Sequence, residues 1–395
     1  MTSNRSLVTV IIVVAQFLGT SLWFVGNISI PQIPLPDLAS TAAIGAALSA
    51  VQLGFIGGTL IFAFLALADR FSPSKVFFVS AICGALANAA LLLPKINIEL
   101  ILASRFITGF FLAGIYPVGM KIASDYYEKG LGKVLGYLVG ALVLGTALPH
   151  FINSLGVDFS YRFLTLTTSF LAILGGFLIL IVVPDGPFRK RQQQIKLKAI
   201  PELFKVEGFR KAAFGYFGHM WELYAFWGFL PVFIQFYADF SNIEINIPLW
   251  SFMIIATGAV SCALGGHISF YKGSKAVALM SLIISGLLCF CSPFLLHLPK
   301  VIFLISLIIW GAAVVADSPQ FSTLVAQNSL AEYRGTALTF VNCIGFGITI
   351  FSIQAFTLWS QHVDPQYIFL ILGAGPIFGI LSLLSSKKKT SIHNE

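Results

Sequence analysis

The sequence predicts an all-α membrane protein in which twelve transmembrane helices form two pseudo-symmetric bundles of six, with both termini in the cytoplasm. Three observations support this prediction: the apolar composition, the number of long apolar runs, and the confinement of basic residues to one side. Hydrophobic residues make up 57% of the 395 positions and charged residues 10%, and the mean hydropathy is +0.89. A soluble domain of this length could not bury so much apolar surface and still present a polar exterior.

Twelve apolar runs predict the twelve spans. A spanning helix needs about 20 apolar residues, because the hydrocarbon core is ~30 Å thick and each helical residue rises ~1.5 Å. Open sheet edges are excluded in lipid, and the runs are too long for barrel strands, so the spans are helical. Prolines that cannot continue a helix, such as Pro31 and Pro184, mark several ends. The predicted spans are 7–30, 43–67, 75–93, 98–122, 131–154, 162–183, 212–236, 248–269, 275–295, 300–327, 334–359 and 366–385.

The orientation follows from the lysines and arginines. Only Lys95, Arg162 and Lys300 lie in one set of connections. The positive-inside rule therefore places the other set, and with it both termini, in the cytoplasm, which requires an even number of spans. This multi-pass arrangement is expected in a cell inner membrane. The cytoplasmic set carries Arg5, Arg70, Lys75, Lys121, Lys129, Lys133, the basic cluster at 189–211, Lys272, Lys275, Arg334 and Lys387 to Lys389.

One long connection divides the chain into two halves. We expect an N-terminal six-helix bundle at 1–183, a cytoplasmic linker at 184–211, a C-terminal six-helix bundle at 212–386 and a cytoplasmic tail at 387–395. The basic linker is interpreted as a solvated tether against anionic headgroups, with a regulatory binding site as the alternative. The turns at 68–75 and 265–275 both end in Ser-Lys at the same place in their halves, which suggests a repeated architecture.

Other classes of protein are disfavoured. The net charge of +8 is dispersed over helix ends, so no nucleic-acid partner is expected. The five cysteines form no CxxC pair, which argues against a disulfide framework or a zinc site. No Walker motif and no convergent nucleophile–base arrangement is present, so neither ATP hydrolysis nor another enzyme activity is expected. We expect no cofactor and no metal, although His219 and Glu222 form an HxxE pattern that leaves a metal as a remote alternative.

Three charged residues lie within apolar spans: Arg105 in the fourth, Glu222 in the seventh and Asp317 in the tenth. A charge at membrane depth costs at least ~2.5–3.5 kcal/mol, so it usually faces a protein interior or a watery path. Glu222 is about 15 Å deep, where a carboxylate must be paired, hydrated or protonated. The alternatives are static ion pairs for the carboxylates and snorkelling to the interface for Arg105. Regularly spaced buried charges favour a solute transporter.

Two motifs carry a resemblance to the major facilitator superfamily that extends over essentially the whole chain. Asp69-Arg70 resembles the loop 2–3 signature Gly-x-x-x-Asp-Arg-x-Gly-Arg-Arg, although 72–74 departs from it and only Lys75 closes it. Arg105-Phe106-Ile107-Thr108-Gly109 resembles the helix 4 motif Arg-x-x-x-Gly. The glycines and Pro149-His150 of the fifth span resemble an antiporter signature only in part. The resemblance implies that Asp69, Arg70 and Lys75 form a conformational gate.

In this family helices 1, 4, 7 and 10 line a central cavity, and the polar residues of these spans are therefore the candidate site. His219 lies one turn before Glu222 and could exchange a hydrogen bond or proton with it. Trp227 could stack on an organic solute, with a membrane-interface or core role as the alternative. The residues expected to bind substrate or couple transport are Trp23, Asn27, Arg105, Tyr116, His219, Glu222, Trp227, Asp317 and Gln320.

The function implied is secondary active transport of a small organic solute by rocking of the two bundles, with protons as the coupling ion. Arg105 favours a solute that bears a carboxylate or phosphate. The expected partners are the solute, protons and membrane lipids, and the family usually works as a monomer. One alternative is a proton-driven exporter of drugs or siderophores, which the partial antiporter signature favours weakly. A non-transporting membrane sensor is a remote alternative, because the chain lacks a soluble signalling domain.

Overall fold

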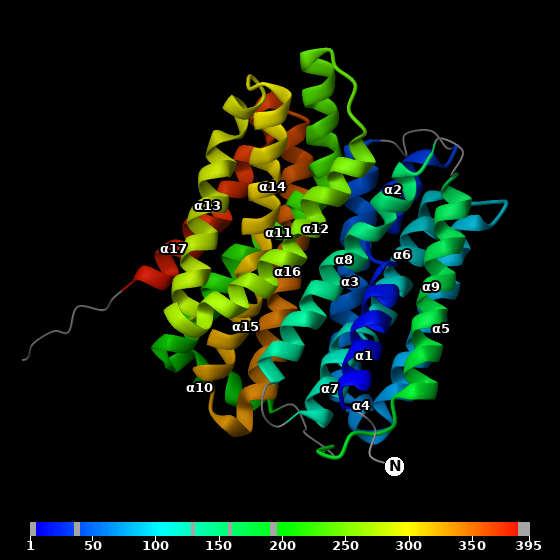
Figure 1. The fold of residues 1–395 in the computed structure, drawn as a ribbon, viewed down its shortest axis with the longest axis vertical. Coiled ribbons are helices and arrows are strands. Elements are labelled where there is room, and N and C mark those ends of the chain that lie inside the picture. Colours follow the sequence, from blue (N-terminus) through cyan, green and yellow to red (C-terminus); the bar gives the residue numbers. More distant parts are fainter. Residues whose placement is uncertain (1–4, 35–39, 128–130, 157–159, 190–195, 386–395) are drawn as a thin grey trace, which may run out of the picture.

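The chain folds into long helices that run side by side along one axis (Figure 1). The computed structural model describes residues 5–34, 40–127, 131–156, 160–189 and 196–385, and within these ranges it contains no strand. The all-helical prediction is therefore confirmed. The predicted tail at 387–395 and the middle of the predicted linker, 190–195, lie outside the described residues.

The N-terminal half contains six spans. The first is α1 (Arg5–Thr20) continued by α2 (Val25–Ser29), and the fourth is α6 (Ile98–Leu112) continued by α7 (Tyr116–Tyr126). The other four are continuous helices: α3 (Thr41–Phe64), α5 (Pro73–Ala89), α8 (Leu131–Ser154) and α9 (Tyr161–Val182). Three short elements connect them, namely η1 (Ile30–Gln32), α4 (Leu67–Arg70) and η2 (Ala90–Leu92).

The C-terminal half repeats this plan. Its fourth span is again divided, into α14 (Lys300–Ala316) and α15 (Ser318–Gln327), and its last begins as η5 (Pro365–Gly373) before α17 (Ala374–Leu384). The remaining spans are α11 (Glu207–Ser241), α12 (Ile247–Lys272), α13 (Ser274–Leu295) and α16 (Arg334–Ser360). The short elements are η3 (Leu197–Ala199), α10 (Ile200–Lys205) and η4 (Ala331–Tyr333).

Within the described ranges, eleven helical segments are long and apolar enough to cross a membrane. The span not among them is α11, which has 35 residues but carries many polar and aromatic side chains. It packs against α15, α16 and α17, and most of its side chains are buried in the protein rather than exposed to lipid. Its composition is that of an interior helix, which is consistent with a twelfth span.

Three of the predicted spans are divided in the structure. The first is interrupted at 21–24, the fourth at 113–115 and the tenth at Asp317. Pro117 and Pro319 are the second residues of the helices that follow the last two breaks, and proline withholds the N–H that would have closed the preceding turn. The two halves therefore bend their fourth spans at corresponding places.

We call the end of the bundle that carries α4, α10 and the described linker residues the linker face, and the opposite end the far face. The linker face is the lower end in Figure 1, where the labels of α4, α7 and α10 lie. The linker residues touch both halves there: Arg189 donates to the Phe71 carbonyl at 2.6 Å, and Lys196 Nζ lies 3.3 Å from Glu332 Oε2. Each described end of the linker is thus attached to one half at this face.

The second and fourth spans of each half approach closely through glycine. A Cβ added at Gly54 on α3 would overlap the Phe106 carbonyl oxygen of α6, and one added at Gly109 would overlap the Val51 carbonyl oxygen. Gly311 stands in the same relation to Ile254 in the C-terminal half. Small residues let helices pack backbone to backbone in membranes, where van der Waals contact supplies much of the association.

We predict that Gly54→Ala lowers the stability of the purified protein by about 1–3 kcal/mol, because the methyl group forces two helices apart. The matched control is Gly57→Ala on the same helix, whose added Cβ would meet nothing within 4 Å. This control should be neutral or stabilising by up to ~1 kcal/mol, since alanine favours the helix. Thermal unfolding in detergent measures both, and equal melting temperatures would contradict the packing argument.

Candidate functional site

A cavity of about 470 Å³ lies between the two halves. The N-terminal half contributes residues of α3, α7 and α8, including Thr59 and Tyr116, and the C-terminal half contributes residues of α11, α15 and α16. Tyr216 of α11 donates a hydrogen bond to Asn342 Oδ1 of α16 at 2.7 Å. Exposed residues at helix ends, such as Gln327, also line the cavity, so it opens toward the linker face.

Six aromatic residues close the cavity toward the far face, and we call them the aromatic roof: Trp23, Phe24, Phe55, Tyr224, Trp227 and Phe346. All six are at most 2% exposed. Phe55 lies one turn beyond Thr59 on α3, and Phe346 lies one turn beyond Asn342 on α16. Trp23 packs on Phe55 with ring centroids 4.8 Å apart, and Phe55 packs on Phe346 at 4.5 Å. The roof therefore joins the two halves.

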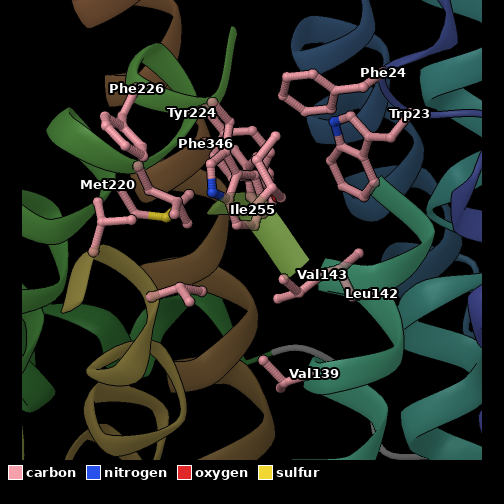
Figure 2. Packing of buried hydrophobic residues seen from close by; sticks show 14 of the residues in the cluster. Trp23, Phe24, Val139, Leu142, Val143, Met220, Tyr224, Phe226, Ile255 and Phe346 are labelled. Carbon is pink, nitrogen blue, oxygen red and sulfur yellow. The ribbon is translucent and has the colours of Figure 1, made fainter. Parts of the chain in front are cut away.

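Figure 2 shows how the roof crosses the interface. Trp23 and Phe24 extend from the first span toward Tyr224 and Phe346 of the other half, and Val143 of α8 lies below these rings in the view. The ring centroids of Trp23 and Tyr224 are 5.7 Å apart, and those of Tyr224 and Trp227 are 5.5 Å apart. These distances are typical of packed aromatic pairs.

Several polar atoms at the roof are buried without a partner. Among the described residues, no hydrogen-bond acceptor faces Trp23 Nε1, Trp227 Nε1 or Asn27 Nδ2. Asn27 is the third residue of α2, and its amide nitrogen lies 3.6 Å from the position of a Cβ added at Gly228 on α11. Three unpartnered donors therefore lie where the first and seventh spans meet.

Beyond the roof, contacts at the far face hold the two halves together. Gln354 of α16 donates to Ser49 Oγ of α3 at 2.7 Å. On the other flank, the rings of Phe151 on α8 and Phe252 on α12 are 5.0 Å apart. The structure is thus closed at the far face and open at the linker face.

Arg105 is buried behind the roof, in the N-terminal bundle. Its guanidinium donates to the carbonyl groups of Leu22 at 2.9 Å and Trp23 at 2.6 Å, where the first span loses its helical hydrogen bonds. A third bond, at 3.2 Å, reaches Asn88 Oδ1 of α5. No carboxylate of the described residues forms an ion pair with it. Arg105 therefore neither snorkels to the interface nor pairs with Glu222 or Asp317.

Asn88 extends this network to the sixth span. Its amide donates to Ser169 Oγ at 3.0 Å and, at 3.3 Å each, to the Thr165 carbonyl and Thr168 Oγ1. Arg105 and Asn88 together connect the first, third, fourth and sixth spans. Asn88 was missed in the sequence analysis, although a lone asparagine in an apolar run was a usable signal.

Glu222 points into the C-terminal bundle rather than the cavity. Trp310 Nε1 donates to Oε1 at 2.7 Å, Ser285 donates to Oε2 at 2.9 Å, and the Cys289 thiol lies 3.3 Å from Oε1. The three donors come from α13 and α14. A buried carboxylate held by this many donors is stable only while they stay in place, so its protonation state is coupled to the packing of these helices.

His219 pairs with Asp317, not with Glu222 as the helical spacing had indicated. Its Nδ1 lies 2.8 Å from Asp317 Oδ1, and both side chains are at most 2% exposed. Asp317 occupies the break between α14 and α15, and Gln320 is buried one turn later. The seventh and tenth spans are thereby linked by an ionisable pair close to the Glu222 site.

The predicted site residues thus divide into two groups. Tyr116 lines the cavity, Trp23 and Trp227 belong to its roof, and Asn27 adjoins that roof. Arg105, His219, Glu222, Asp317 and Gln320 are buried in the bundles and do not line the described cavity. Asn342, Phe55 and Phe346 were missed because only four of the spans were considered, and Tyr216 was missed although it lies on one of these spans. Tyr216 could have been found, since it lies one turn before His219 on the same helix.

The predicted gate residues lie at the linker face. Asp69 Oδ1 is 3.4 Å from Lys121 Nζ of α7, which also bonds to Asp125 Oδ1 at 2.6 Å. Arg189 of the linker donates to the Asp69 carbonyl at 3.0 Å. Arg70 and Lys75 are exposed. In this state Asp69 is engaged within the N-terminal half and its linker.

The part of the chain that the structure describes contains no group of three His, Cys, Asp or Glu residues arranged to hold a metal ion. The HxxE pattern of α11 gathers no further ligand of that kind, since His219 and Glu222 have separate partners.

Comparisons with known proteins agree with this architecture. The family model described as Major Facilitator Superfamily matches residues 12–353. The niacin transporter NiaP of Acinetobacter baylyi is 38% identical over 112 residues, which cover 26% of this chain and 25% of that protein. An uncharacterized MFS-type transporter of Methanocaldococcus jannaschii is 22% identical over 227 residues, 56% of this chain and 53% of that protein. The chain thus matches about a quarter and about half of the lengths of these relatives.

Among solved structures, a mutant of the nucleoside transporter NupG superposes with a TM-score of 0.72. The alignment covers 95% of this chain and 98% of that one at 17% sequence identity, so it shows a shared fold.

We predict that Arg105→Lys destabilises the protein by about 1.5–3 kcal/mol, because a lysine cannot reproduce the planar fork that holds two carbonyls and Asn88 together. The exposed Arg70→Lys is the matched control and should leave the melting temperature unchanged. A native melting temperature for Arg105→Lys, combined with weaker solute binding, would instead assign Arg105 to the solute.

Proposed function

Because the chain belongs to the Major Facilitator Superfamily, we propose that it is a secondary active transporter that moves a small organic solute by alternating access. The observation that carries this proposal is the cavity between the halves, open at the linker face and closed by the aromatic roof. A cavity of about 470 Å³ is within the usual range for small-molecule sites. The similarity to a transporter named for niacin supports an organic solute of modest size.

In the alternate state the far face would be open and the linker face closed. In it the roof and the Gln354–Ser49 contact separate, while the linker-face ends of the halves come together. Repeated bundles that rock about a central site are the general design of such carriers. Asp69, Arg70 and Lys75 would then act as a gate, since the Asp69–Lys121 pair lies at the face that must close.

The linker face is assigned to the cytoplasm of a cell inner membrane. The basic loops, the linker cluster and both chain ends belong to this side of the predicted topology, which the positive-inside rule supports. The structure then corresponds to a carrier that is open inward.

We assign proton coupling to the buried acidic groups of the C-terminal half. Glu222 contacts donors from α13 and α14 at once, so taking up a proton changes the hydrogen bonds among three helices. The His219–Asp317 pair lies one turn away on α11 and offers a second exchangeable proton. Charges at this depth are retained where they serve ion or proton pathways.

We predict that Glu222→Gln abolishes accumulation driven by a pH gradient but leaves counterflow exchange, because glutamine keeps the shape and cannot change charge. The assay uses proteoliposomes and a solute that stabilises the purified chain in a thermal-shift screen. Glu202→Gln, at the exposed α10, is the control and should transport normally. Wild-type accumulation by the Glu222 variant would remove this residue from the coupling role.

We further predict that a disulfide at the far face arrests transport. A Cβ at Gly45 would lie 3.5 Å from Thr357 Cβ, within the range that disulfides require. The Gly45→Cys, Thr357→Cys double variant should lose flux on oxidation and recover it on reduction. Each single variant controls for the native cysteines. If the oxidised, cross-linked double variant transports as fast as the same variant after reduction of the disulfide, the far face does not open during the cycle.

A further inference from the structure

The aromatic roof contains aromatic rings and buried hydrogen-bond donors that are not needed merely to close the cavity. Aliphatic side chains would seal a cavity as well, yet this surface presents six aromatic rings drawn from both halves. It also contains the indole N–H groups of Trp23 and Trp227, which are fully buried and unpartnered among the described residues. Burying a donor without an acceptor is unfavourable, so a roof that only closed the cavity would leave these two N–H groups without the hydrogen bonds they can make.

We infer that the roof is the recognition surface for a planar aromatic carboxylate, an inference that rests on the proposed transport function. When the halves rock apart, the faces of Trp23, Phe24, Tyr224 and Phe346 separate, and a flat ring can take the place of their mutual contacts. Trp23 and Phe346 already lie nearly parallel, with centroids 5.7 Å apart and an interplanar angle of 25°. Aromatic surfaces pack best against another aromatic ring in offset or edge-on geometry.

The free polar groups specify acceptors on the solute. An indole nitrogen only donates hydrogen bonds, and the unpartnered Asn27 nitrogen is also a donor. Three donors near one interface match the two oxygens of a carboxylate, which accept several bonds and make stronger ones than a neutral carbonyl does.

The surrounding charge also favours an anion. Arg105 holds the Trp23 carbonyl at 2.6 Å and has no carboxylate partner among the described residues, so its positive charge is uncompensated directly behind the roof. The two buried carboxylates on the other side are already engaged, Glu222 by three donors and Asp317 by His219. The solute's carboxylate would therefore lie where the first span meets α11, and its ring toward Tyr224 and Phe346.

Three small probes separate these requirements on the unaltered protein. Benzoate is planar and anionic, benzamide is planar and neutral, and cyclohexanecarboxylate is anionic without a flat ring. Calorimetric titration of the full chain in lipid nanodiscs should show benzoate binding about tenfold more tightly than either of the others. Equal affinity of benzoate and cyclohexanecarboxylate overturns the aromatic requirement, and equal affinity of benzoate and benzamide overturns the anionic one.

Two conservative variants test the donors. Trp23→Phe and Trp227→Phe keep a ring in the roof and remove only the N–H, and each should weaken benzoate binding about tenfold. Trp359→Phe is the matched control, because Trp359 donates to the Tyr367 carbonyl near the far face, away from the roof, and should bind benzoate normally. Unchanged affinity in both roof variants, which lie in different halves, overturns the assignment.

A flux experiment separates this inference from the proposed function. Counterflow of labelled benzoate in proteoliposomes supports both. Benzoate binding that responds to the roof variants but gives no flux keeps the recognition surface and overturns the transport function. Flux of a saturated or cationic solute by a chain that does not bind benzoate keeps the transport function and overturns the recognition surface.

Discussion

The hydrogen bonds from Arg105 to the Leu22 and Trp23 carbonyls are the interaction on which the site depends. The bilayer core supplies no water, so backbone that leaves the helix must find partners inside the protein. A charged guanidinium donates to two such carbonyls and to Asn88 at once, which makes the break in the first span tolerable. That break turns Trp23 and Phe24 toward the opposite half. Arg105 thus stabilises the break in the first span, and its positive charge also acts electrostatically on any ligand that binds beside it.

The two halves share a scaffold but not a charge distribution. Gly109 and Gly311 permit the same close helix contact and stand the same number of residues before Pro117 and Pro319, where the fourth span of each half bends. The N-terminal half buries an arginine, whereas the C-terminal half buries Glu222 and the His219–Asp317 pair. Repetition therefore accounts for the shared scaffold, and departures from repetition account for the different buried charges of the two halves.

The sequence was sufficient for the architecture and for the burial of its intramembrane charges. Apolar run length determines where a chain crosses lipid, and charges predicted within these runs are expected to face the protein interior, as the buried side chains of Arg105 and Glu222 do. Their direction could not be predicted, because an interior membrane helix is apolar around most of its circumference and carries no stripe that marks its buried face. Hence His219 was matched with Glu222 by spacing, whereas Asp317 is its partner through tertiary packing.

The separation of the buried carboxylates Glu222 and Asp317 from the cavity has a mechanistic consequence. A carboxylate that lined the cavity would be hydrated and would compete with the solute for hydrogen-bond donors. Glu222 instead contacts donors of the protein, so a change in its protonation acts through these contacts. Trp310, which donates to Glu222, packs on Phe226 of α11 with ring centroids 4.8 Å apart. The same helix presents Tyr224 and Trp227 to the roof. Energetic coupling can be carried by a contiguous set of packed groups, and α11 is the element common to both sites. A change in protonation that shifts this helix would thereby alter the roof, the proposed recognition surface for the solute.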